Sequence, residues 1–426
     1  MCRLVKGRVV VAEEKSPRSV VVVGAGMVGL SVAWFLQERG VEVTVVDRAG
    51  VAAGASWGNA GWLSPGLAIP LPEPSVLRYG MRSLLDRDAP LYIPTKPDPR
   101  LWAFLTKFAT HCTMRQWERG MQSYRPINAL CLDAFDVLTS NGVEAPTIEA
   151  PIMAAFEKAG QADDLRRELE LILRSGQEIS FTEIPGDKVA AEVPQISSNV
   201  ELAIRLDGQR YIDPGAFTQS LADAVVARGG RIRTGFTARN LRHGARGVTV
   251  EAYAGDPEHA DAVVIATGAW LNDLARPLGV RTPVQAGRGY SFTVPTEQTV
   301  PCPIYFPATR VACTPYQGQL RVAGTMEFRS PDHPLDTGRV ASIIKASRPL
   351  LTGVDWSKRT DTWVGPRPVT PDGLPLIGGT RVPSVYIAGG HGMWGVTLGP
   401  VTGQLLAEQI VLGKQPAELR AFSPTR

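Results

Sequence analysis

The chain has 426 residues, of which 44% are hydrophobic and 20% are charged. This composition is typical of a folded globular protein and excludes a disordered one, and the length favours two domains over one. The 45 basic and 41 acidic residues leave a formal net charge of +4, which is too small to indicate nucleic acid as a partner. It does not oppose contact with an anionic membrane surface.

Cysteine and histidine usage gives no sign of a disulfide framework or a metal site. The five cysteines are odd in number and show no C-x-x-C spacing, and the five histidines show no H-E-x-x-H or similar ligand spacing. No apolar run approaches the roughly 18 residues of a membrane span, and residues 1–18 lack the apolar core of a secretion signal. We therefore expect no metal and a cytoplasmic protein, with peripheral contact at the inner face of the membrane as an alternative. Residues 1–16 are predicted to be a loose extension.

Residues 20–47 predict a strand, a glycine-rich turn, a helix and a second strand. Gly24, Gly26 and Gly29 follow four valines in the G-x-G-x-x-G spacing of a dinucleotide site. The first glycine allows a tight turn, the second leaves room for a pyrophosphate, and the third lets the helix pack closely on the sheet. Asp47 ends the second strand, where a carboxylate accepts hydrogen bonds from a ribose. The segment predicts dinucleotide binding but does not distinguish NAD from FAD.

The middle of the chain mixes helical and strand patterns. A loop rich in small residues at 50–66 suits close contact with a bulky ring system. Strict alternation within 285–328 predicts an antiparallel sheet. Helices are predicted at 101–141 (with Trp102, Leu105 and Phe108 at core spacing), 163–174, 213–226 and 339–348. Strands are predicted from Ile232 through Ala238, at 248–252 and at 261–270.

The last third carries the most specific motifs, G-P-R-P-V-T-P-D-G-L-P-L-I-G and G-G-H-G-M-W-G-V-T-L-G-P. With G-A-G-M-V-G-L-S-x-A-W-x-L, G-A-S-W-G-N-A-G-W-L-S-P-G, G-R-G-Y-S and A-G-T-M-E-F, they resemble the D-amino-acid oxidase-type FAD oxidoreductases over residues 20–410. Within that family the D-amino-acid dehydrogenase branch is the most similar.

The resemblance implies an α/β fold in which a doubly wound, Rossmann-like FAD-binding domain carries an inserted α+β substrate domain with an antiparallel sheet. It assigns residues 17–75, 206–282 and 362–426 to the FAD-binding domain. Residues 76–205 and 283–361 are assigned to the substrate domain.

The resemblance also implies where FAD binds. The glycine turn holds the pyrophosphate, Asp47 the adenosine ribose, and the 50–66 loop the flavin. The turn at 390–395 is expected to open a helix whose N-terminus points at the pyrimidine edge of the flavin, where the reduced ring carries negative charge. The predicted cofactor contacts are Gly24, Ala25, Gly26, Met27, Val28, Gly29, Asp47, Arg48, Ala55, Ser56, Asn59, Ala60, Gly61, Ala238, Thr267, Gly268, Trp270, Gly390, His391, Gly392, Met393, Trp394 and Gly395.

Four residues are predicted to act on the substrate. Arg367 aligns with the arginine that clamps the substrate carboxylate in related oxidases, a task that suits a planar, always-charged fork. Tyr290 either faces the carboxylate or flavin ring or belongs to the core. His391 either transfers a proton or packs in the turn beside the flavin, and Trp394 walls the substrate side chain.

The activity implied by the resemblance is oxidative deamination of a D-amino acid. A neutral amine passes hydride from its α-carbon to flavin N5, and the imine is hydrolysed to a 2-oxo acid. A quinone or another acceptor then takes the electrons. Glycine, sarcosine or D-proline-like secondary amines are alternative substrates, and a non-catalytic flavin-bearing electron-carrier subunit is an alternative of another class.

The flavin is expected to bind without a covalent bond. Amine oxidases similar to sarcosine oxidase attach it through a cysteine just before the T-P-D motif. This chain has Gly365 and Pro366 there, and none of its cysteines lies close in the sequence.

Overall fold

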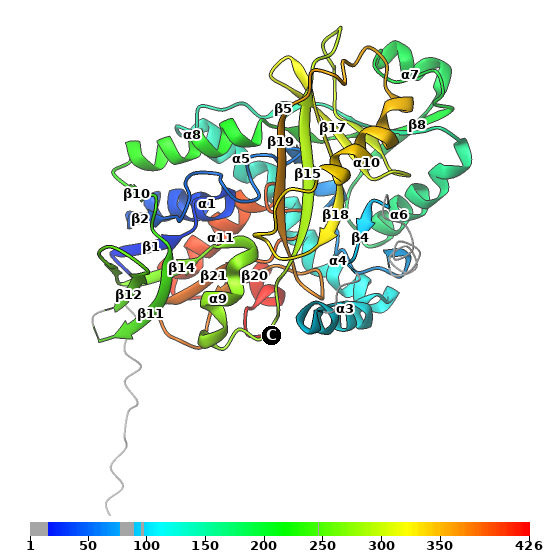
Figure 1. Ribbon diagram of the computed structural model, residues 1–426. Coiled ribbons are helices and arrows are strands. Elements are labelled where there is room, and N and C mark those ends of the chain that lie inside the picture. The colour runs from blue at the N-terminus through cyan, green and yellow to red at the C-terminus, as the bar shows by residue number, and fades with distance from the viewer. Residues whose placement is uncertain (1–15, 77–88, 95–97, 246) are drawn as a thin grey trace, which may run out of the picture.

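The structure, a computed structural model, describes residues 16–76, 89–94, 98–245 and 247–426. The extension predicted at 1–16 therefore lies outside the described residues apart from Ser16. Two large sheets stand side by side, with α1 and α11 beside the first and α10 across the second (Figure 1). Within the described ranges, no helix has the length and apolar character needed to cross a bilayer.

The first sheet confirms the predicted strand, turn, helix and strand unit, as β1 (Ser19–Val23), α1 (Met27–Gln37) and β2 (Glu42–Val46). Its order is β10-β2-β1-β14-β21-β20, with only β20 antiparallel to its neighbour. The other strands are β10 (Arg231–Arg233), β14 (Ala262–Ile265), β20 (Leu376–Gly379) and β21 (Val385–Gly389). The mostly parallel order is that of a doubly wound dinucleotide-binding sheet.

The valines of β1 are buried on both faces of this sheet. Val20 and Val22 pack in a cluster with α1, α8 (Pro214–Ala227) and α11 (Gly399–Leu412). Val21 and Val23 pack on the other face against a three-stranded sheet and α9 (Leu271–Ala275). That small sheet comprises β11 (Ala238–Gly244), β12 (Gly247–Ala252) and β13 (Glu258–Ala260). A continuous valine run is what burial on both faces requires.

Close packing of two helices fixes the C-terminal part of the chain beside the glycine turn. A Cβ atom at Gly399 would lie 2.7 Å from Cγ of Met27, and one at Gly403 would lie 2.5 Å from the carbonyl carbon of Ser31. Only glycine at these two positions lets α11 approach α1 this closely. The helix begins at Gly399 and not directly after the 390–395 turn, which corrects the prediction that the turn itself opens it.

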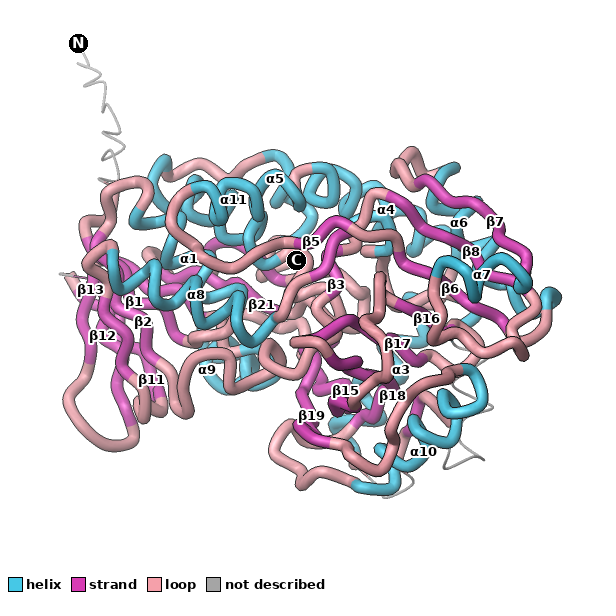
Figure 2. Tube along the Cα trace, turned by 90° about the horizontal axis from the view of Figure 1, so that it is seen from above, coloured by secondary structure: helices cyan, strands magenta, loops and turns pink. Residues whose placement is uncertain are grey.

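The second sheet has nine strands in the order β19-β15-β18-β17-β16-β6-β8-β7, with β4 paired to β18. The predicted antiparallel pair is confirmed as β15 and β18. The strands are β4 (Leu91–Tyr92), β6 (Ile152–Phe156), β7 (Ser180–Pro185), β8 (Leu202–Asp207), β15 (Gln285–Val294), β16 (Ile304–Phe306), β17 (Val311–Tyr316), β18 (Gln319–Phe328) and β19 (Thr360–Val369). Figure 2 shows β7 and β8 at the opposite end of the molecule from β12 and β13.

Two strands of the second sheet cross the predicted domain boundaries. β8 runs across 205/206 and β19 runs across 361/362, and both are hydrogen-bonded within the nine-stranded sheet. The part of β19 that carries Arg367 therefore belongs to the substrate sheet by its pairing, although it was assigned to the FAD-binding domain.

The remaining helices largely follow the predicted segments. The 101–141 segment becomes α3 (Pro99–His111), α4 (Met114–Ala129) and α5 (Cys131–Ser140). Further helices among the described residues are α6 (Asp163–Arg174), α7 (Gly186–Glu192) and α10 (Thr337–Ser347). A second small sheet has the order β3-β9-β5, formed by β3 (Trp62–Leu63), β5 (Ile148–Glu149) and β9 (Arg210–Tyr211).

Two local predictions need correction. Trp102 is 44% exposed, and the buried positions of α3 are Leu101, Phe104 and Phe108, so the apolar side of the helix is rotated from the predicted one. Ile232 does not begin a strand that continues through Ala238. It lies in β10, which pairs with β2 in the parallel sheet, while β11 forms a separate hairpin with β12.

Candidate active site

The glycine turn has the shape of a dinucleotide cradle. Gly24 has φ of +119°, and a Cβ atom there would overlap the carbonyl of Ala266. A Cβ atom at Gly29 would overlap the carbonyl oxygen of Gly24, whereas one at Gly26 would meet only the Ser56 hydroxyl at 3.3 Å. α1 has no capping side chain at Gly26. Its first-turn N–H groups can therefore face an anion in the space beside Gly26.

Asp47 ties the end of β2 to this turn. Its Oδ2 accepts a hydrogen bond from the Ala25 N–H at 2.9 Å, and its Oδ1 accepts from Ala49 N–H at 2.8 Å and Gly50 N–H at 3.0 Å. A carboxylate offers about four acceptor positions. Room therefore remains for the ribose hydroxyl predicted there.

Thr267 supplies a second feature that fits a cofactor. Its Oγ1 is buried and has no hydrogen-bond partner among the residues that the structure describes. The residue follows β14 and lies against the glycine turn, because a Cβ atom at Gly24 would come within 3.4 Å of the Thr267 nitrogen. A buried hydroxyl without a partner is costly, so a ligand oxygen at this place would satisfy it. The residues of the turn thus fit the pyrophosphate of FAD.

The predicted flavin loop is held by helix α1 on one side and by the nine-stranded sheet on the other. The Ser56 hydroxyl accepts from Met27 N–H at 3.1 Å, which attaches the loop to the first turn of α1. The hydroxyls of Ser291 and Thr314, from the nine-stranded sheet, donate to the carbonyls of Gly58 at 2.7 Å and Ala60 at 2.6 Å. The loop therefore lies between the glycine turn and one face of the substrate sheet.

That face of β15 carries small and polar side chains, and the opposite face carries large, buried ones. Gly287, Gly289, Ser291 and Thr293 alternate with Arg288, Tyr290, Phe292 and Val294 along the strand. Tyr290, Phe292 and Val294 pack in the cluster beneath α10. Since successive side chains of a strand point to opposite faces, the small and polar set faces the flavin loop.

Tyr290 is consequently not brought to the predicted substrate position. Its hydroxyl donates to Glu327 Oε2 at 2.5 Å inside the core and accepts from Arg288. Burial and the Glu327 carboxylate raise its pKa. The tyrosine belongs to a buried polar network on the far face of the sheet, which corrects its assignment beside the substrate carboxylate.

Arg367 lies on the face of the nine-stranded sheet opposite to Tyr290, which is the face toward the flavin loop. A Cβ atom at Gly289 would overlap the guanidinium, so Arg367 lies flat against the glycine backbone of β15. Its Nη1 donates to the carbonyl of Thr325 at 2.9 Å, and Thr325 itself has the left-handed φ of +59° at an irregularity in β18. Strained backbone of this kind is concentrated at functional sites. Burial lowers the pKa of Arg367 to about 10, which still leaves it charged at neutral pH.

No carboxylate forms an ion pair with Arg367 within the described part of the chain, although the side chain is half-buried. A buried cation without a counter-ion is unfavourable unless a ligand supplies the charge. The guanidinium therefore fits an incoming carboxylate.

The turn at 390–395 lies beside Arg367. Gly392 N–H donates to the carbonyl of Pro368 at 2.8 Å, next to Arg367. His391 points away from it, into the protein, where its Nε2 is 2.9 Å from the Thr402 hydroxyl on α11. Burial lowers the pKa of His391 to about 4, so the ring is neutral at physiological pH. These contacts favour the packing role of His391 over proton transfer.

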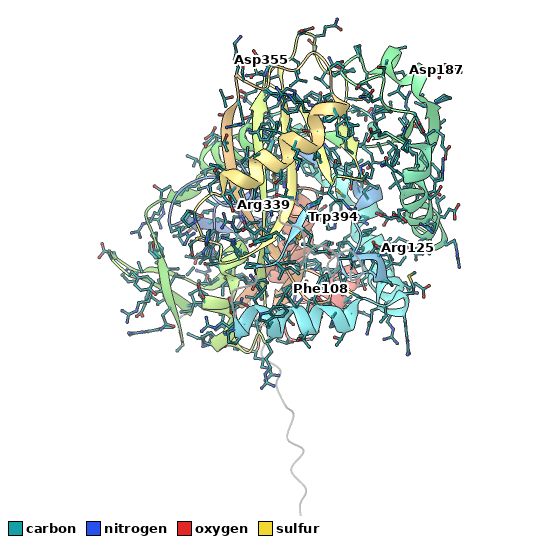
Figure 3. The ribbon with its side chains drawn as sticks, turned by 45° about the vertical axis from the view of Figure 1, so that its right-hand side comes forward. Phe108, Arg125, Asp187, Arg339, Asp355 and Trp394 are labelled. Atoms are coloured by element: carbon teal, nitrogen blue, oxygen red, sulfur yellow. The ribbon has the colours of Figure 1, made fainter. Side chains whose placement is uncertain are left out.

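Two tryptophans border the site. Trp394, in the middle of the molecule in Figure 3, is half-buried and donates from Nε1 to the carbonyl of Ile69 at 2.8 Å. Trp363 lies over Gly58 and Gly365, where a Cβ atom on either glycine would overlap its ring. Trp363 was not predicted, although it precedes the G-P-R-P motif and is two residues from a glycine that it covers.

Arg321 is a further residue that the sequence did not reveal. It is 1% exposed, its Nη1 donates to the carbonyl of Trp57 at 2.8 Å, and its guanidinium stacks 3.7 Å from the Tyr316 ring centroid. Its Nε and Nη2 have no hydrogen-bond partner among the described residues, and neither does Oγ1 of Thr293, which pairs with Arg321 across the strands. The same holds for Thr325 Oγ1, further along β18. The alternation of polar and apolar residues in β18 could have indicated Arg321.

Several predicted cofactor residues lie at the rim of the site. Arg48 and Trp270 stack on each other beyond the ends of β2 and β14, with the guanidinium carbon 3.8 Å from the indole centroid. Ala238 begins β11, two residues after Phe236, whose N–H donates to the carbonyl of Asp47 at 3.0 Å. Among the remaining predicted contacts, Val28 lies in the first turn of α1 and Gly268 begins a 3-10 turn after β14. The others lie in the 50–66 loop and the 390–395 turn: Ala55, Asn59, Gly61, Gly390, Met393 and Gly395.

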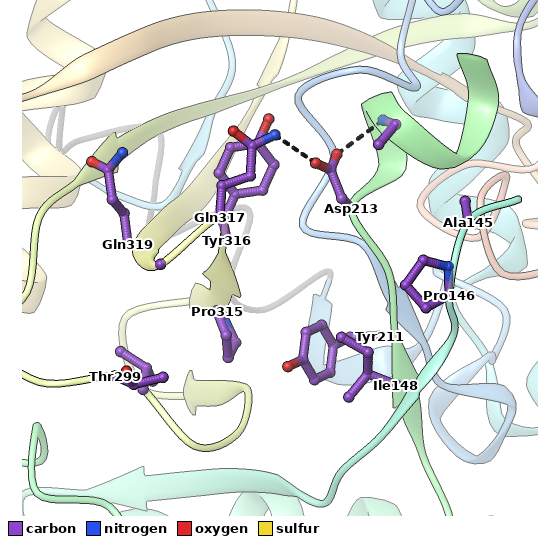
Figure 4. Close-up of a pocket in the computed structure, with 13 residues that line it drawn as sticks. Ala145, Pro146, Ile148, Tyr211, Asp213, Thr299, Pro315, Tyr316, Gln317 and Gln319 are labelled. Atoms are coloured by element: carbon purple, nitrogen blue, oxygen red, sulfur yellow. Dashed lines mark hydrogen bonds between the residues drawn. The ribbon is translucent and has the colours of Figure 1, made fainter. Parts of the chain in front are cut away.

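A pocket of about 270 Å³ lies elsewhere, at the hairpin that joins β17 to β18. Figure 4 shows Tyr211 and Pro146 on one side of it and Tyr316 and Gln317 on the other, with Gln317 bonded to Asp213. Neither the glycine turn nor Arg367 lines this pocket.

The chain belongs to the family of FAD-dependent oxidoreductases, whose family model matches residues 19–409. This confirms FAD as the cofactor and the oxidoreductase class predicted from the motifs. The fold agrees. The solved glycine oxidase from Geobacillus kaustophilus has a TM-score of 0.74 at 22% identity, covering 96% of this chain and 98% of that one. The L-proline dehydrogenase from P. horikoshii has a TM-score of 0.68 at 18% identity, covering 97% and 98%.

Two curated relatives share the name D-amino acid dehydrogenase. The D-amino acid dehydrogenase of Methylobacterium nodulans is 32% identical over 405 residues, covering 93% of this chain and 96% of that protein. The D-amino acid dehydrogenase of Xylella fastidiosa is 30% identical over 399 residues, covering 92% and 91%.

Proposed function

We propose that this chain catalyses the oxidative deamination of a D-amino acid and passes the electrons to a quinone or a similar acceptor. The observation that carries the proposal is the half-buried Arg367 guanidinium, which has no carboxylate partner among the described residues and lies where the flavin loop and the 390–395 turn meet. The D configuration is supported by the relatives named D-amino acid dehydrogenase, which are 32% and 30% identical to this chain.

Arg367 would fix the substrate through its carboxylate. Thr325 holds Nη1 through its carbonyl oxygen, and Gly289 supports the flat side of the guanidinium, so the remaining N–H groups stay free for a paired contact. A bidentate arginine and carboxylate pair fixes both distance and orientation. The α-carbon of the substrate is then presented at a constant place.

When bound, FAD supplies the acceptor for the hydride that leaves the substrate α-carbon. The chain contributes positioning and a site with little water, bordered by Trp363 and Trp394. His391 is neutral and hydrogen-bonded to Thr402, so we assign it no role in proton transfer. The substrate amine therefore reacts in its neutral form, after its proton has gone to solvent.

The cofactor is proposed to be held without a covalent bond. Glycine and proline stand at the position before the T-P-D motif, and the described cysteines, Cys112, Cys131, Cys302 and Cys313, are all buried. Precipitation of the protein with acid should leave the yellow colour in the supernatant. Colour that stays in the pellet would contradict non-covalent binding.

The function is tested by anaerobic mixing of the yellow holoenzyme with a panel of D- and L-amino acids, glycine, sarcosine and D-proline. We expect the flavin absorbance to bleach rapidly with at least one primary D-amino acid and slowly or not at all with its L-enantiomer. Bleaching restricted to glycine or the secondary amines would show that these, and not a primary D-amino acid, are the substrates. An unbleached flavin across the panel would favour an electron-carrier subunit.

The acceptor is tested separately, with the substrate found in the panel. We expect turnover with a soluble quinone in a closed, oxygen-free vessel, and little hydrogen peroxide in air without an added acceptor. Peroxide formed in air at the rate of turnover would contradict the proposed acceptor. A quinone acceptor would place the protein in the cytoplasm, in contact with the inner face of the membrane.

A further inference from the structure

A loop of the substrate domain reaches across to the rim of the cofactor site. It comprises residues 329–336, between β18 and α10, and we call it the strap. Its carboxylate Asp332 accepts from the indole N–H of Trp270, with both oxygens 3.1 Å from Nε1. The same carboxylate lies 3.3 Å from Nη2 of Arg48. Asp332 therefore joins two side chains of the other domain.

Arg48 and Trp270 lie on either side of the glycine turn that follows β1. Arg48 lies two residues after the end of β2, and Trp270 lies five residues after the end of β14. β2 and β14 are the two neighbours of β1 in the sheet, one on each side. Because adjacent strands are about 4.8 Å apart, the stacked pair spans roughly 10 Å across the carboxyl end of β1, where the glycine turn begins.

The backbone contacts of both residues lead into the same turn. Arg48 is bonded in sequence to Asp47, which accepts from Ala25 N–H of the turn. Trp270 N–H donates to the carbonyl of Thr267 at 3.1 Å, and Thr267 carries the buried, unpaired hydroxyl. The stacked pair is thus the outer boundary of the place assigned to the FAD pyrophosphate.

The strap is fixed at both of its ends to the nine-stranded sheet. Gln285 donates to the carbonyl of Arg329 at 3.1 Å, and Arg288 donates to the carbonyl of Pro334 at 2.9 Å. Arg329 also pairs with the fully buried Glu327 at 2.5 Å. These anchors hold the carboxylate of Asp332 in place, so its contacts with the other domain need little further ordering.

We propose that Asp332 is a positioning residue for FAD: it holds Arg48 and Trp270 as a roof over the glycine turn and thereby retains the cofactor. The proposal rests on FAD binding at this turn. Asp332 itself acts through the two side chains and is assigned no contact with the dinucleotide. Retention of FAD is therefore coupled to the strap of the substrate domain.

Because Asp332 is negatively charged, the proposal predicts a direction for the change in the rate of FAD release when the residue is removed. A carboxylate that did not hold the roof would only repel the pyrophosphate, and its removal would then slow FAD release. If it holds the roof, its removal speeds release. The two roles thus change the dissociation rate in opposite directions.

The test measures FAD release from holoenzyme diluted below its dissociation constant, by the rise in flavin fluorescence, with no substrate present. We expect Asp332→Ala to release FAD about three- to ten-fold faster than the parent, the size of effect expected for one charge-assisted hydrogen bond at a partly exposed site. Asp332→Asn, which keeps an acceptor for the indole N–H, should fall between the two.

A double-mutant cycle identifies the route of the effect. Arg48→Met combined with Trp270→Phe removes both partners of Asp332, so Asp332→Ala should change release much less in that background. Unchanged or slower release in Asp332→Ala, or a full effect of Asp332→Ala in the background without both partners, would overturn the proposal. A parent protein that carries no FAD would instead refute the function on which it rests.

Asp355→Ala is the matched control. Asp355 also lies in the substrate domain, is also exposed, and also has an ion pair at 3.3 Å, with Lys358. It sits at the other end of β15, where its N–H donates to Pro295, and Figure 3 shows it at the top of the molecule. Its replacement should leave FAD release at the parent rate.

Discussion

The glycine turn and the face of the nine-stranded sheet that carries Arg367 build the two halves of the site in different ways. The turn is made by backbone from a single continuous segment, in which Gly24 and Gly29 meet each other and Asp47 closes the loop. The sheet face is made by side chains from strands far apart in the sequence. Arg367 of β19 lies on Gly289 of β15 and bonds Thr325 of β18.

The difference has a consequence for how each half fails. A turn in which backbone atoms already touch has no room for an added atom, so a single methyl group disrupts it. At the sheet face the close contacts, such as that of Arg367 with Gly289, are made by side chains, and the chemistry depends on one charged group. Disruption of the turn should therefore abolish FAD binding. Loss of Arg367 should weaken substrate binding while FAD stays bound.

The largest effect is expected for Gly29→Ala. The added Cβ atom would overlap the carbonyl oxygen of Gly24, and the turn would have to open. We expect protein that purifies without yellow colour and melts at a lower temperature, measured by flavin content and thermal denaturation. Gly160→Ala is the control, because a Cβ atom there meets nothing within 4 Å. A Gly29→Ala protein with full FAD content would contradict the structural account of the turn.

The next effect is expected for Arg367→Met. Removing one member of a buried pair costs about 3–5 kcal/mol, which corresponds to a fall in kcat/KM of about two to three orders of magnitude or somewhat more. FAD content should stay near that of the parent. Arg367→Lys should also be poor, since an ammonium lacks the paired donors.

Arg205→Met is a control for the loss of an arginine from the same sheet. Arg205 lies on β8 and pairs with Asp207 at the surface, at 2.8 Å. It should retain kcat/KM within a few-fold of the parent. Equal losses in the Arg205 and Arg367 variants would show that the effect is structural.

An intermediate effect, on stability and not on activity, is expected at His391. Its pKa is about 4 in the folded protein, against about 6.5 in an unfolded chain. As the pH falls from 6.5 to 4 the unfolded chain takes up this proton and the folded protein does not, so the free energy of unfolding decreases by about 3 kcal/mol.

His391→Gln should remove that part of the acid destabilisation and should leave the pH profile of kcat unchanged between pH 6 and 8. Denaturant unfolding at pH 7 and pH 4.5 measures the first, and steady-state kinetics the second. A pH profile that loses its acid limb in His391→Gln would instead assign the histidine to proton transfer.

The smallest effect is expected for Thr267→Val, and it has opposite signs with and without FAD. The buried hydroxyl has no partner within the described part of the chain, so its removal should stabilise the apoprotein by about 1 kcal/mol. FAD affinity should fall several-fold if the hydroxyl binds the pyrophosphate. Thr218→Val is the control, since that hydroxyl donates to Pro214 at 2.6 Å and its loss should destabilise the apoprotein. Unchanged affinity in Thr267→Val would remove Thr267 from the cofactor site.

The sequence predicted the cofactor half well because each step there is local. The spacing of Gly24, Gly26 and Gly29 after a valine run specifies a strand, a turn and a helix with no knowledge of the rest of the chain. The strand at Ile232 was misplaced because its pairing partner is Val45 of β2, almost two hundred residues earlier in the chain. Trp102 was misplaced because helical spacing alone does not fix which side of α3 meets the core.

The substrate half was predictable only in part. Arg367 was identified through a motif, but the face on which it lies depends on the register between β15 and β19. That register puts Gly289 beneath the guanidinium and turns Tyr290 to the other side. The polar alternation of Ser291 and Thr293 was visible in the sequence, but only the structure shows that it faces the flavin loop.

The central claim is that Arg367 binds the substrate carboxylate, and the most direct measurement compares two substrates in two proteins. Anaerobic flavin reduction is followed with the preferred D-amino acid and with its carboxamide, in the parent and in Arg367→Met. The parent is predicted to prefer the acid over the amide by about a hundred-fold or more, and the variant by no more than a few-fold. A variant that keeps its flavin and the full preference for the acid would contradict the account.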